Sequence, residues 1–324
     1  MSVASVFGRS CTKYRIFNIE KDLFSRFISK CHFSVLRNLQ SPNKHLEYCQ
    51  KLVKTRDYEN YLATALLPSL SQHVGFAVRA FNIEVAQIQE STSISETGKM
   101  RVGFWRQNIS ETFQGRPPNH PVTILLALCL EKQWLSEKWF QRIIDVREKY
   151  LHNTAFMTLD DAEDYGEYAM SSVFYLVLES LDVSNNDIFY AASHLGIANS
   201  LATLVKSAPH FIKQGHVILP TELCVKHKIS QEEILRGQSQ EKLVEIVFEV
   251  ASQASLHLDG MRKYLKDVPQ LSRGAKNVFL PSIPCDMFLE HVQKLDFNLN
   301  HESLNRKHWM LPLKLYLASR QNSI

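Results

Sequence analysis

The sequence predicts an all-α protein with one helical domain. From Pro42 onward, nearly every segment carries apolar residues three and four positions apart, which is the spacing of one helix face. The alternating pattern of a half-buried strand is almost absent. The interior has no low-complexity linker and no repeat of fixed period, so we expect a single domain over residues 41–324.

The breaks between the apolar segments define the expected helices. Pro or Gly stands in PSLS (68–71), GRPPNHP (115–121) and SAPHFIKQG (207–215), where helical geometry fails. The helices expected between these and weaker breaks cover residues 44–66, 72–90, 97–113, 119–131, 135–151, 159–181, 186–206, 220–236, 241–265, 285–296 and 312–320.

Two of these helices have patterns that predict burial. VTILLALCL at 122–130 is the most apolar run, but it falls far short of the ~20 apolar residues of a membrane span. It is therefore expected to be a core helix. In 241–265 an apolar stripe predicts an amphipathic helix with one packed face; it comprises Leu243, Val247, Val250, Ala254, His257, Met261 and Leu265. His257 on this stripe is expected to be a core or boundary histidine rather than a metal ligand.

The densest acid cluster, TLDDAEDYGEY at 158–168, has two interpretations. Asp160 and Asp164 are four residues apart and so share a helix face, as paired carboxylates for a divalent cation would. The structural interpretation is favoured, because Thr158 is a good N-cap and Asp161 stands where a capping box places its acid. Acids in a first turn also suit the helix dipole.

The first forty residues are basic. They hold seven Lys or Arg against Glu20 and Asp22, so they account for the net charge of +4 and leave the rest near neutral. Scarce acids, frequent Ser and the lack of a signal-peptide core are typical of a mitochondrial presequence, which we expect over residues 1–40; a disordered basic tail is the alternative. The near-neutral body argues against nucleic-acid binding.

Other common functional signatures are missing from the sequence. Six Cys are spread without a CxxC or a close Cys/His quartet, so we expect reduced thiols and neither a zinc site nor a disulfide framework. There is no glycine-rich phosphate loop and no GxSxG.

One apolar segment lacks acids altogether. LATLVKSAPHFIKQGHVILP at 201–220 contains no Asp or Glu. With the residues before it, the run LGIANSLATLVKSAPHFIKQGHVILP at 195–220 resembles the second signature of the squalene and phytoene synthase family, whose usual form is LGxAxQLTNIxRDxxEDxxxGRxYLP. The alignment has no gap from Leu195 to Pro220.

Further segments resemble the same family in the same order. Residues 56–87 are similar to the first signature, in which an LLP turn precedes YAxCRxxDDxxD; Leu66, Leu67 and Pro68 match the turn and Arg79 matches the Arg. RVGFWRQ, HPV and LDDAEDYGEYAMSSV follow between the two signatures. The resemblance covers about residues 45–265 and implies an isoprenoid-synthase-like helical bundle.

Active members of this family join two prenyl diphosphates, and both Asp-rich motifs hold Mg²⁺, a hard cation that prefers carboxylate oxygens. Here neither motif keeps an aspartate. The first falls on Asn82, Ile83 and Ala86, and the second on Ser207, His210 and Phe211. Glu84 lies about 200° around the helix from Asn82 and cannot replace it. The resemblance therefore implies a pseudoenzyme with no metal and no cofactor.

The resemblance also implies a role. The degraded motifs, the basic leader and HWMLPLKLYLASR at 308–320 are similar to a branch of the family that supports early assembly of mitochondrial respiratory complex I. It implies a matrix protein, peripheral to the inner membrane, that binds assembly intermediates or a membrane-arm subunit. The alternatives are metal-independent binding of a prenyl or lipid diphosphate through Arg79, Lys206 and Lys213, and an active prenyl transferase that uses Asp160 and Asp164. Asp57 and Tyr58 are further candidates for a leftover pocket.

Overall fold

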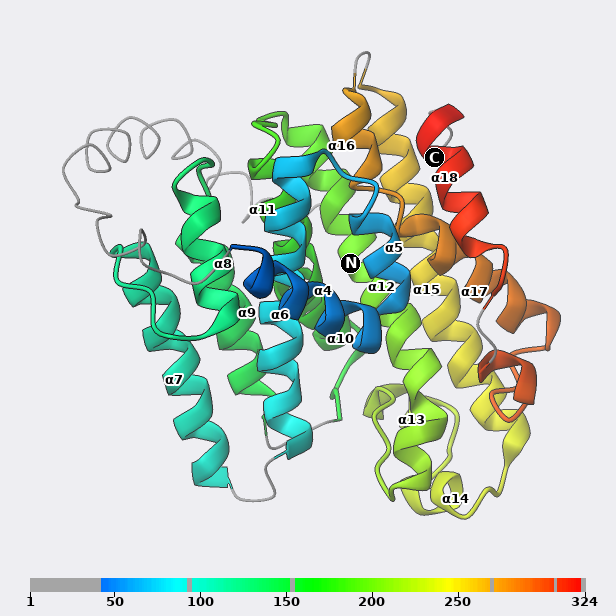
Figure 1. Ribbon diagram of the computed structural model, residues 1–324. Coiled ribbons are helices and arrows are strands. Elements are labelled where there is room, and N and C mark those ends of the chain that lie inside the picture. Colours follow the sequence, from blue (N-terminus) through cyan, green and yellow to red (C-terminus); the bar gives the residue numbers. More distant parts are fainter. Residues whose placement is uncertain (1–41, 92–94, 152–154, 269–270, 306–307, 322–324) are drawn as a thin grey trace.

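Helices make up all the regular structure of the residues that the computed structural model describes, which are 42–91, 95–151, 155–268, 271–305 and 308–321. Figure 1 shows these helices packed side by side. The all-α prediction is confirmed. The expected presequence, 1–40, lies outside the described residues.

The elements carry the labels of Figure 1. They are α4 (Pro42–Arg56), α5 (Tyr58–Thr64), α6 (Ser69–Ser91), α7 (Ser95–Phe113), α8 (Pro121–Leu130), α9 (Glu137–Lys149), α10 (Leu159–Gly166), the π-helix η2 (Glu167–Ser171), α11 (Ser172–Glu179), α12 (Asn186–Lys213), α13 (Thr221–Lys226), α14 (Gln231–Leu235), α15 (Gln240–Lys266), α16 (Arg273–Asn277), α17 (Ser282–Lys294), the 3₁₀-helix η3 (Glu302–Asn305) and α18 (Leu311–Gln321).

The helix expected at 44–66 is divided in two. Asp57 interrupts it, with non-helical backbone angles (φ −145°, ψ 68°), and caps α5 by accepting a hydrogen bond from the Asn60 amide. Two further expected helices are also interrupted. The helix at 159–181 contains the π-turn η2, and the one at 220–236 is split into α13 and α14. The short helix α16 was not expected.

The predicted end of the helix at 206 is wrong, because α12 continues through Pro209 to Lys213. A proline removes one backbone donor but does not always end a helix. The end is set instead by Gly215, whose φ of +84° suits glycine. The amides of Gly215 and His216 donate to the carbonyls of Ile212 (3.0 Å) and Phe211 (2.9 Å), which is a Schellman C-cap.

The main core surrounds α12. This helix packs along α15, and the two run side by side in Figure 1. The α15 stripe is buried as expected at Leu243, Val247, Val250, Ala254 and Met261. By length and composition α12 could cross a membrane, but 67% of its most apolar window is buried in the protein, as in a core helix.

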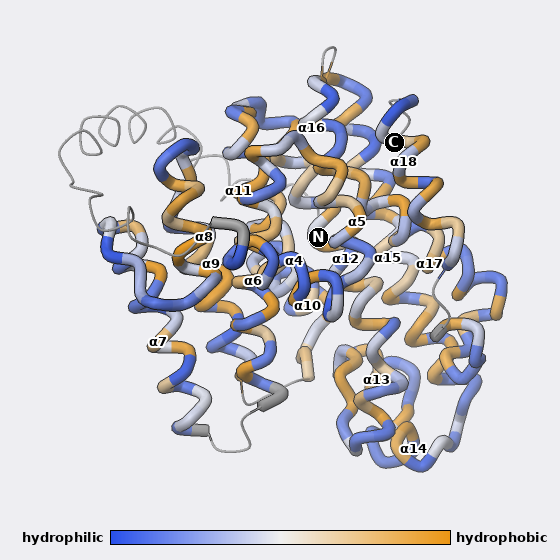
Figure 2. Tube along the Cα trace, viewed as in Figure 1, coloured by the Kyte–Doolittle hydropathy of each residue, from blue (hydrophilic) through white to orange (hydrophobic). Residues whose placement is uncertain are grey.

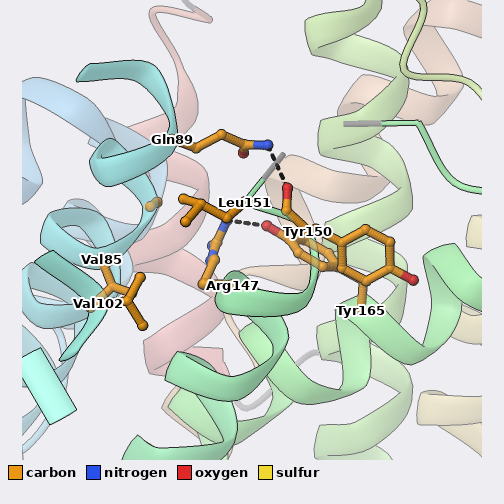
Figure 3. Close-up of a pocket in the computed structure, with 8 residues that line it drawn as sticks. Val85, Gln89, Val102, Arg147, Tyr150, Leu151 and Tyr165 are labelled. Atoms are coloured by element: carbon orange, nitrogen blue, oxygen red, sulfur yellow. Dashed lines mark hydrogen bonds between the residues drawn. The ribbon is translucent and has the colours of Figure 1, made fainter. Parts of the chain in front are cut away.

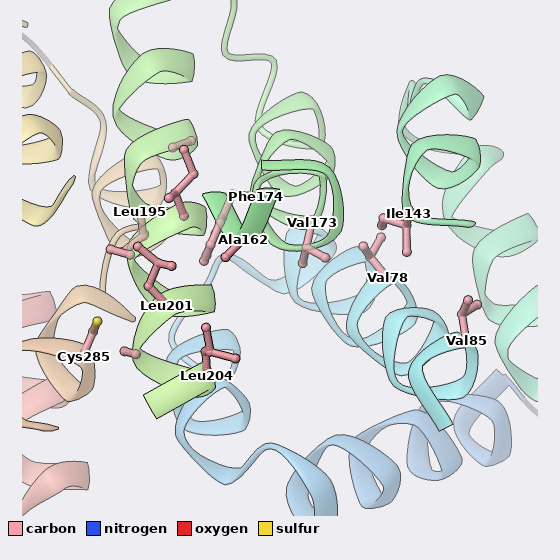
Figure 4. Close-up of a cluster of buried hydrophobic side chains, with 14 of the residues drawn as sticks. Val78, Val85, Ile143, Ala162, Val173, Phe174, Leu195, Leu201, Leu204 and Cys285 are labelled. Atoms are coloured by element: carbon pink, nitrogen blue, oxygen red, sulfur yellow. The ribbon is translucent and has the colours of Figure 1, made fainter. Parts of the chain in front are cut away.

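Both helices that carry the resembling signatures contribute to this core. Figure 4 shows Val78 and Val85 of α6 in one apolar cluster with Leu201 and Leu204 of α12. The helix α8 is buried at eight of its ten residues, as its composition predicts. In Figure 2 apolar and polar stretches alternate along most helices, the pattern of amphipathic helices around a core.

A second, smaller core fixes the C-terminal helix. Leu311, Leu315 and Ala318 of α18 pack with Ala63 of α5 and Leu280. The four cysteines of the described residues, Cys49, Cys129, Cys224 and Cys285, are free and buried.

Candidate functional site

The first degraded motif lies on α6, where Asn82 and Ala86 share a helix face. The Asn82 side chain is half-buried, and its oxygen accepts a hydrogen bond from Arg147 Nη2 of α9 at 3.2 Å. Its amide nitrogen lies 3.6 Å from Met170 Sδ of η2. The face that would hold magnesium ligands is therefore in contact with a cation.

Arg147 is held in this position by an aromatic group. Its Nη1 donates to the Tyr165 hydroxyl of α10, and its guanidinium lies 5.0 Å from the centre of the same ring. Tyr165 in turn packs edge-on against Tyr150 (5.5 Å) and Phe156 (5.4 Å). Stacking and a charge-assisted hydrogen bond together fix the cation.

A narrow pocket with no room for a water molecule lies beside Arg147. Figure 3 shows the side chains around it, with the Arg147–Tyr165 bond and the bond from Gln89 Nε2 to the Tyr150 carbonyl (2.8 Å) drawn as dashed lines. Ala86, the last position of the first motif, also lines it. Ala86 thus lines this pocket and Asn82 contacts Arg147 beside it, whereas Ile83 packs against the core.

The second degraded motif lies in the last two turns of α12. The Ser207 hydroxyl donates to the Leu204 carbonyl at 3.2 Å. The His210 Nε2 atom lies 3.0 Å from the side-chain Nε2 of Gln214. Phe211 packs against the main core. These three side chains are engaged by their own helix or by the core.

The three candidate phosphate-binding cations are placed differently from one another. Arg79 is buried, 8% exposed, and its Nε donates to Thr64 Oγ1 at 2.9 Å. Lys206 forms a surface ion pair with Glu59 of α5 at 2.8 Å. Lys213 is exposed at the end of α12.

Asp57 is the electrostatic counterpart of Arg79. Burial raises the pKa of Asp57, and the nearby Arg79 charge opposes that rise. Burial lowers the pKa of Arg79, and the Asp57 charge opposes that fall. The Arg79 guanidinium also lies 5.4 Å from the centre of the Phe174 ring. The start of α5 thus supplies one carboxylate to a cation of α6 and another, Glu59, to a cation of α12.

The acid cluster at 158–168 is a helix start, as the structural interpretation predicts. Thr158 Oγ1 accepts from the Asp161 amide (3.0 Å), and Asp161 Oδ2 accepts from the Thr158 amide (3.2 Å), which completes the capping box. Asp160 and Asp164 are exposed. Partial burial raises the pKa of Asp164, and the positive charge of Lys149 opposes that rise.

His257 lies at the α12–α15 interface. Its Nδ1 is 2.9 Å from Nδ1 of His194, and its Nε2 is 3.4 Å from Glu163 of α10. Burial, and then the His257 charge, lower the pKa of His194 to about 4, so this imidazole is neutral at physiological pH. The prediction of a boundary histidine agrees with this interface position.

Across the described ranges, no group of three or more His, Cys, Asp or Glu is arranged to hold a metal ion. Sequence reasoning missed Arg147, which donates to Asn82, and Tyr165, which accepts from Arg147. Nothing in the local pattern marks them, because a helix-surface Arg and Tyr are common and only tertiary packing brings them to Asn82.

Comparisons with known proteins agree with this fold. The family model described as squalene/phytoene synthase matches residues 53–314. A dehydrosqualene synthase in complex with a ligand superposes with a TM-score of 0.74 over 87% of this chain and 97% of that one, at 19% identity. A squalene synthase from Alicyclobacillus acidocaldarius superposes with a TM-score of 0.69 over 79% of this chain and 96% of that one, at 16% identity.

The sequence identity to curated proteins differs between two groups of relatives. The NADH dehydrogenase (ubiquinone) complex I, assembly factor 6 of Bos taurus is 38% identical over 84% of this chain and 81% of its own length. The Dictyostelium discoideum homolog of that factor is 31% identical over 85% and 77%. Chloroplastic phytoene synthase 2 of Zea mays is 20% identical over 67% and 57%.

Proposed function

The chain belongs to the squalene/phytoene synthase family, and from this we propose that it supports the assembly of mitochondrial respiratory complex I by binding, without prenyl transfer. The observation that carries the proposal is the contrast in similarity. Relatives named as complex I assembly factors or their homologs are 31–38% identical, whereas the phytoene synthase of Zea mays is 20% identical.

The contacts of the first motif position support the non-catalytic part. A magnesium cluster needs several anionic oxygens, and Asn82 offers one neutral oxygen that already accepts from Arg147. The Arg147 cation beside this position would oppose a divalent cation electrostatically. Ala86, Ser207, His210 and Phe211 add no carboxylate to either motif.

The proposal extends to location and partner. We place the protein in the mitochondrial matrix, directed there by residues 1–40 and peripherally attached to the inner membrane. Its partners are complex I assembly intermediates or a subunit of the membrane arm. The basic leader and the names of the relatives support this placement.

The two alternatives have less support. Metal-independent diphosphate binding would need free cations, yet Arg79 is buried beside Asp57 and Lys206 is paired with Glu59. An active transferase through Asp160 and Asp164 would require them as metal ligands, and both lie in the first turns of a capped helix.

Depletion of the protein tests the proposal. Mitochondria from depleted cells are resolved on native gels and stained for NADH dehydrogenase activity, with respiratory complexes III and IV as internal controls. Complex I alone is expected to fall, with early subassemblies accumulating, and the wild-type chain is expected to restore it. Normal complex I after complete depletion would refute the role.

A purified-protein assay tests the non-catalytic part separately. The chain is incubated with farnesyl or geranylgeranyl diphosphate and Mg²⁺, and condensed products are extracted and measured against a blank without protein. We expect no product above the blank. A condensed product above the blank would show that the protein is a prenyl transferase, even if complex I assembly also depends on the protein.

A further inference from the structure

The C-terminal helix carries an apolar face that points away from the protein. Leu313, Tyr316 and Leu317 of α18 are 51%, 47% and 43% exposed, and Trp309, just before the helix, is 83% exposed. We call these four residues the outer face of α18. Residues 313, 316 and 317 are spaced three and four apart and so lie on one side of the helix.

The opposite side of α18 already supplies the contacts that hold it to the protein. Leu311, Leu315 and Ala318 are 4%, 0% and 9% exposed and form the second core. The helix is therefore apolar on two sides, and the outer face is not needed for folding. Clustered exposed apolar side chains of this kind mark an interaction surface.

Charge around the outer face favours an anionic partner. The helix α18 contains Lys314 and Arg320 and no Asp or Glu. Of the charged residues on α18, Lys314 and Arg320 are exposed, and the Arg320 guanidinium lies 5.4 Å from the centre of the Tyr316 ring. A basic segment with no acid is attracted to anionic lipid headgroups.

The side-chain types favour a lipid surface over a protein groove. Trp and Tyr have apolar rings with one polar atom, and they concentrate where acyl chains meet headgroups. Leu313 and Leu317 are long enough to enter the acyl region, and Lys314 and Arg320 can reach the phosphates. Figure 1 shows α18 at an edge of the molecule, where a flat surface can approach it.

We propose that the outer face of α18 binds the surface of an anionic lipid bilayer, with the helix lying in the plane of the interface. With eleven residues, α18 is too short to span a membrane. The proposal rests on the proposed attachment to the inner membrane and names the surface that would make it, but the observations that carry it come from α18 and Trp309. Its test with pure lipid is independent of complex I assembly.

Tryptophan quenching by brominated lipids tests this contact in the full chain. Trp105 and Trp139 are buried and Trp134 is partly buried, so Trp309 is the most accessible of the four indoles. Residues 1–40 contain no Trp, so binding through the basic leader alone gives no direct quenching of this kind. Vesicles of phosphatidylcholine with brominated acyl chains are prepared with and without anionic cardiolipin.

We expect the cardiolipin vesicles to quench fluorescence strongly and the Trp309→Phe variant to lose most of that quenching. Leu313→Ser combined with Leu317→Ser is expected to weaken vesicle binding about tenfold or more, from the lost apolar burial. The matched control combines Val225→Ser with Leu235→Ser, which changes exposed residues of α13 and α14 and should bind as wild type does. Circular dichroism shows that each variant is folded.

Three results would overturn the proposal. The first is unchanged quenching in Trp309→Phe, and the second is unchanged affinity in the folded Leu313/Leu317 variant. The third is a wild-type chain that does not bind vesicles but forms a dimer that this variant converts to monomer, which would make the outer face a contact between two copies. A normal complex I phenotype would leave the lipid result standing, so the two proposals fail separately.

Discussion

Asn82 accepts a hydrogen bond from Arg147 at 3.2 Å, at the position where the family's first Asp-rich motif begins. In an active enzyme that position provides an anion for magnesium. Here a neutral amide faces a cation that Tyr165 also holds. The helix α6 packs in the core, and the Asn82 side chain on it is hydrogen-bonded to Arg147.

Restoring one aspartate is not expected to restore metal binding. Asn82→Asp should pair with Arg147 and leave the free energy of unfolding unchanged or about 1 kcal/mol higher, because the new hydrogen bond is charge-assisted. Calorimetry with MgCl₂ should detect no binding. Asn82→Ala, as the control, should lose about 1 kcal/mol with the hydrogen bond. Saturable Mg²⁺ binding by Asn82→Asp would argue that Arg147 does not block the site.

The buried charges of Arg79 and Asp57 should depend on each other. Arg79→Met is expected to cost about 3 kcal/mol in urea unfolding, because it leaves the Asp57 carboxylate in a poorly solvated place. Adding Asp57→Asn should recover part of that loss, a non-additivity that a double-mutant cycle measures.

Lys206→Met is the matched control, because its ion pair with Glu59 is 47% and 43% exposed and should contribute less than about 1 kcal/mol. Equal effects of the Arg79 and Lys206 substitutions would contradict the structural role assigned to Arg79.

Glu179 should make stability depend on pH. It is 4% exposed and accepts from the Ser136 amide (2.8 Å) and Trp139 Nε1 (2.7 Å) at the start of α9. Burial raises its pKa from 4.5 to about 7. Between these values the folded protein keeps a proton that the unfolded chain has released, so stability falls as pH rises, by on the order of 3 kcal/mol in total.

Glu179→Gln removes the titrating group and should flatten this dependence. Urea unfolding at about pH 5, 6 and 7.5 in both proteins measures it, with the difference between the two curves as the readout. An identical slope in the variant would assign the pH dependence to other groups.

Gly196 of the second signature should be required for folding rather than for chemistry. A Cβ there would lie 2.1 Å from Ser171 Oγ and 2.5 Å from its backbone nitrogen, where α12 crosses η2. Gly196→Ala is expected to lower stability by about 1–3 kcal/mol or more. Gly103→Ala on α7, with nothing within 4 Å, should instead stabilise by about 0.5–1 kcal/mol. Similar effects in thermal unfolding would refute the close-packing explanation.

The spacing of apolar residues predicted the fold well, because in this chain the apolar positions of the helices are the buried ones. The α15 stripe and the α8 run show this, and the Thr158 capping box was visible because both partners are three residues apart. The break at Asp57 and the passage through Pro209 depend on tertiary packing, which overrides local preference.

The site was predictable only as positions in two signatures. Asn82 and Lys206 could be located by alignment, but their partners could not. Arg147 is 65 residues from Asn82 in the chain, and Glu59 is 147 residues from Lys206. Such contacts have no local sequence signal, so the arrangement of Arg147 and Tyr165 beside Asn82 appears only in three dimensions.

Affinity capture of the chain from mitochondria tests the central claim, assembly by binding, most directly. A tagged wild-type chain is purified after mild crosslinking, and its partners are identified by mass spectrometry, with an unrelated tagged matrix protein as the control. We predict enrichment of complex I subunits that belong to early subassemblies. If depletion lowers complex I but no complex I subunit is captured, the claim that this protein acts by binding is contradicted.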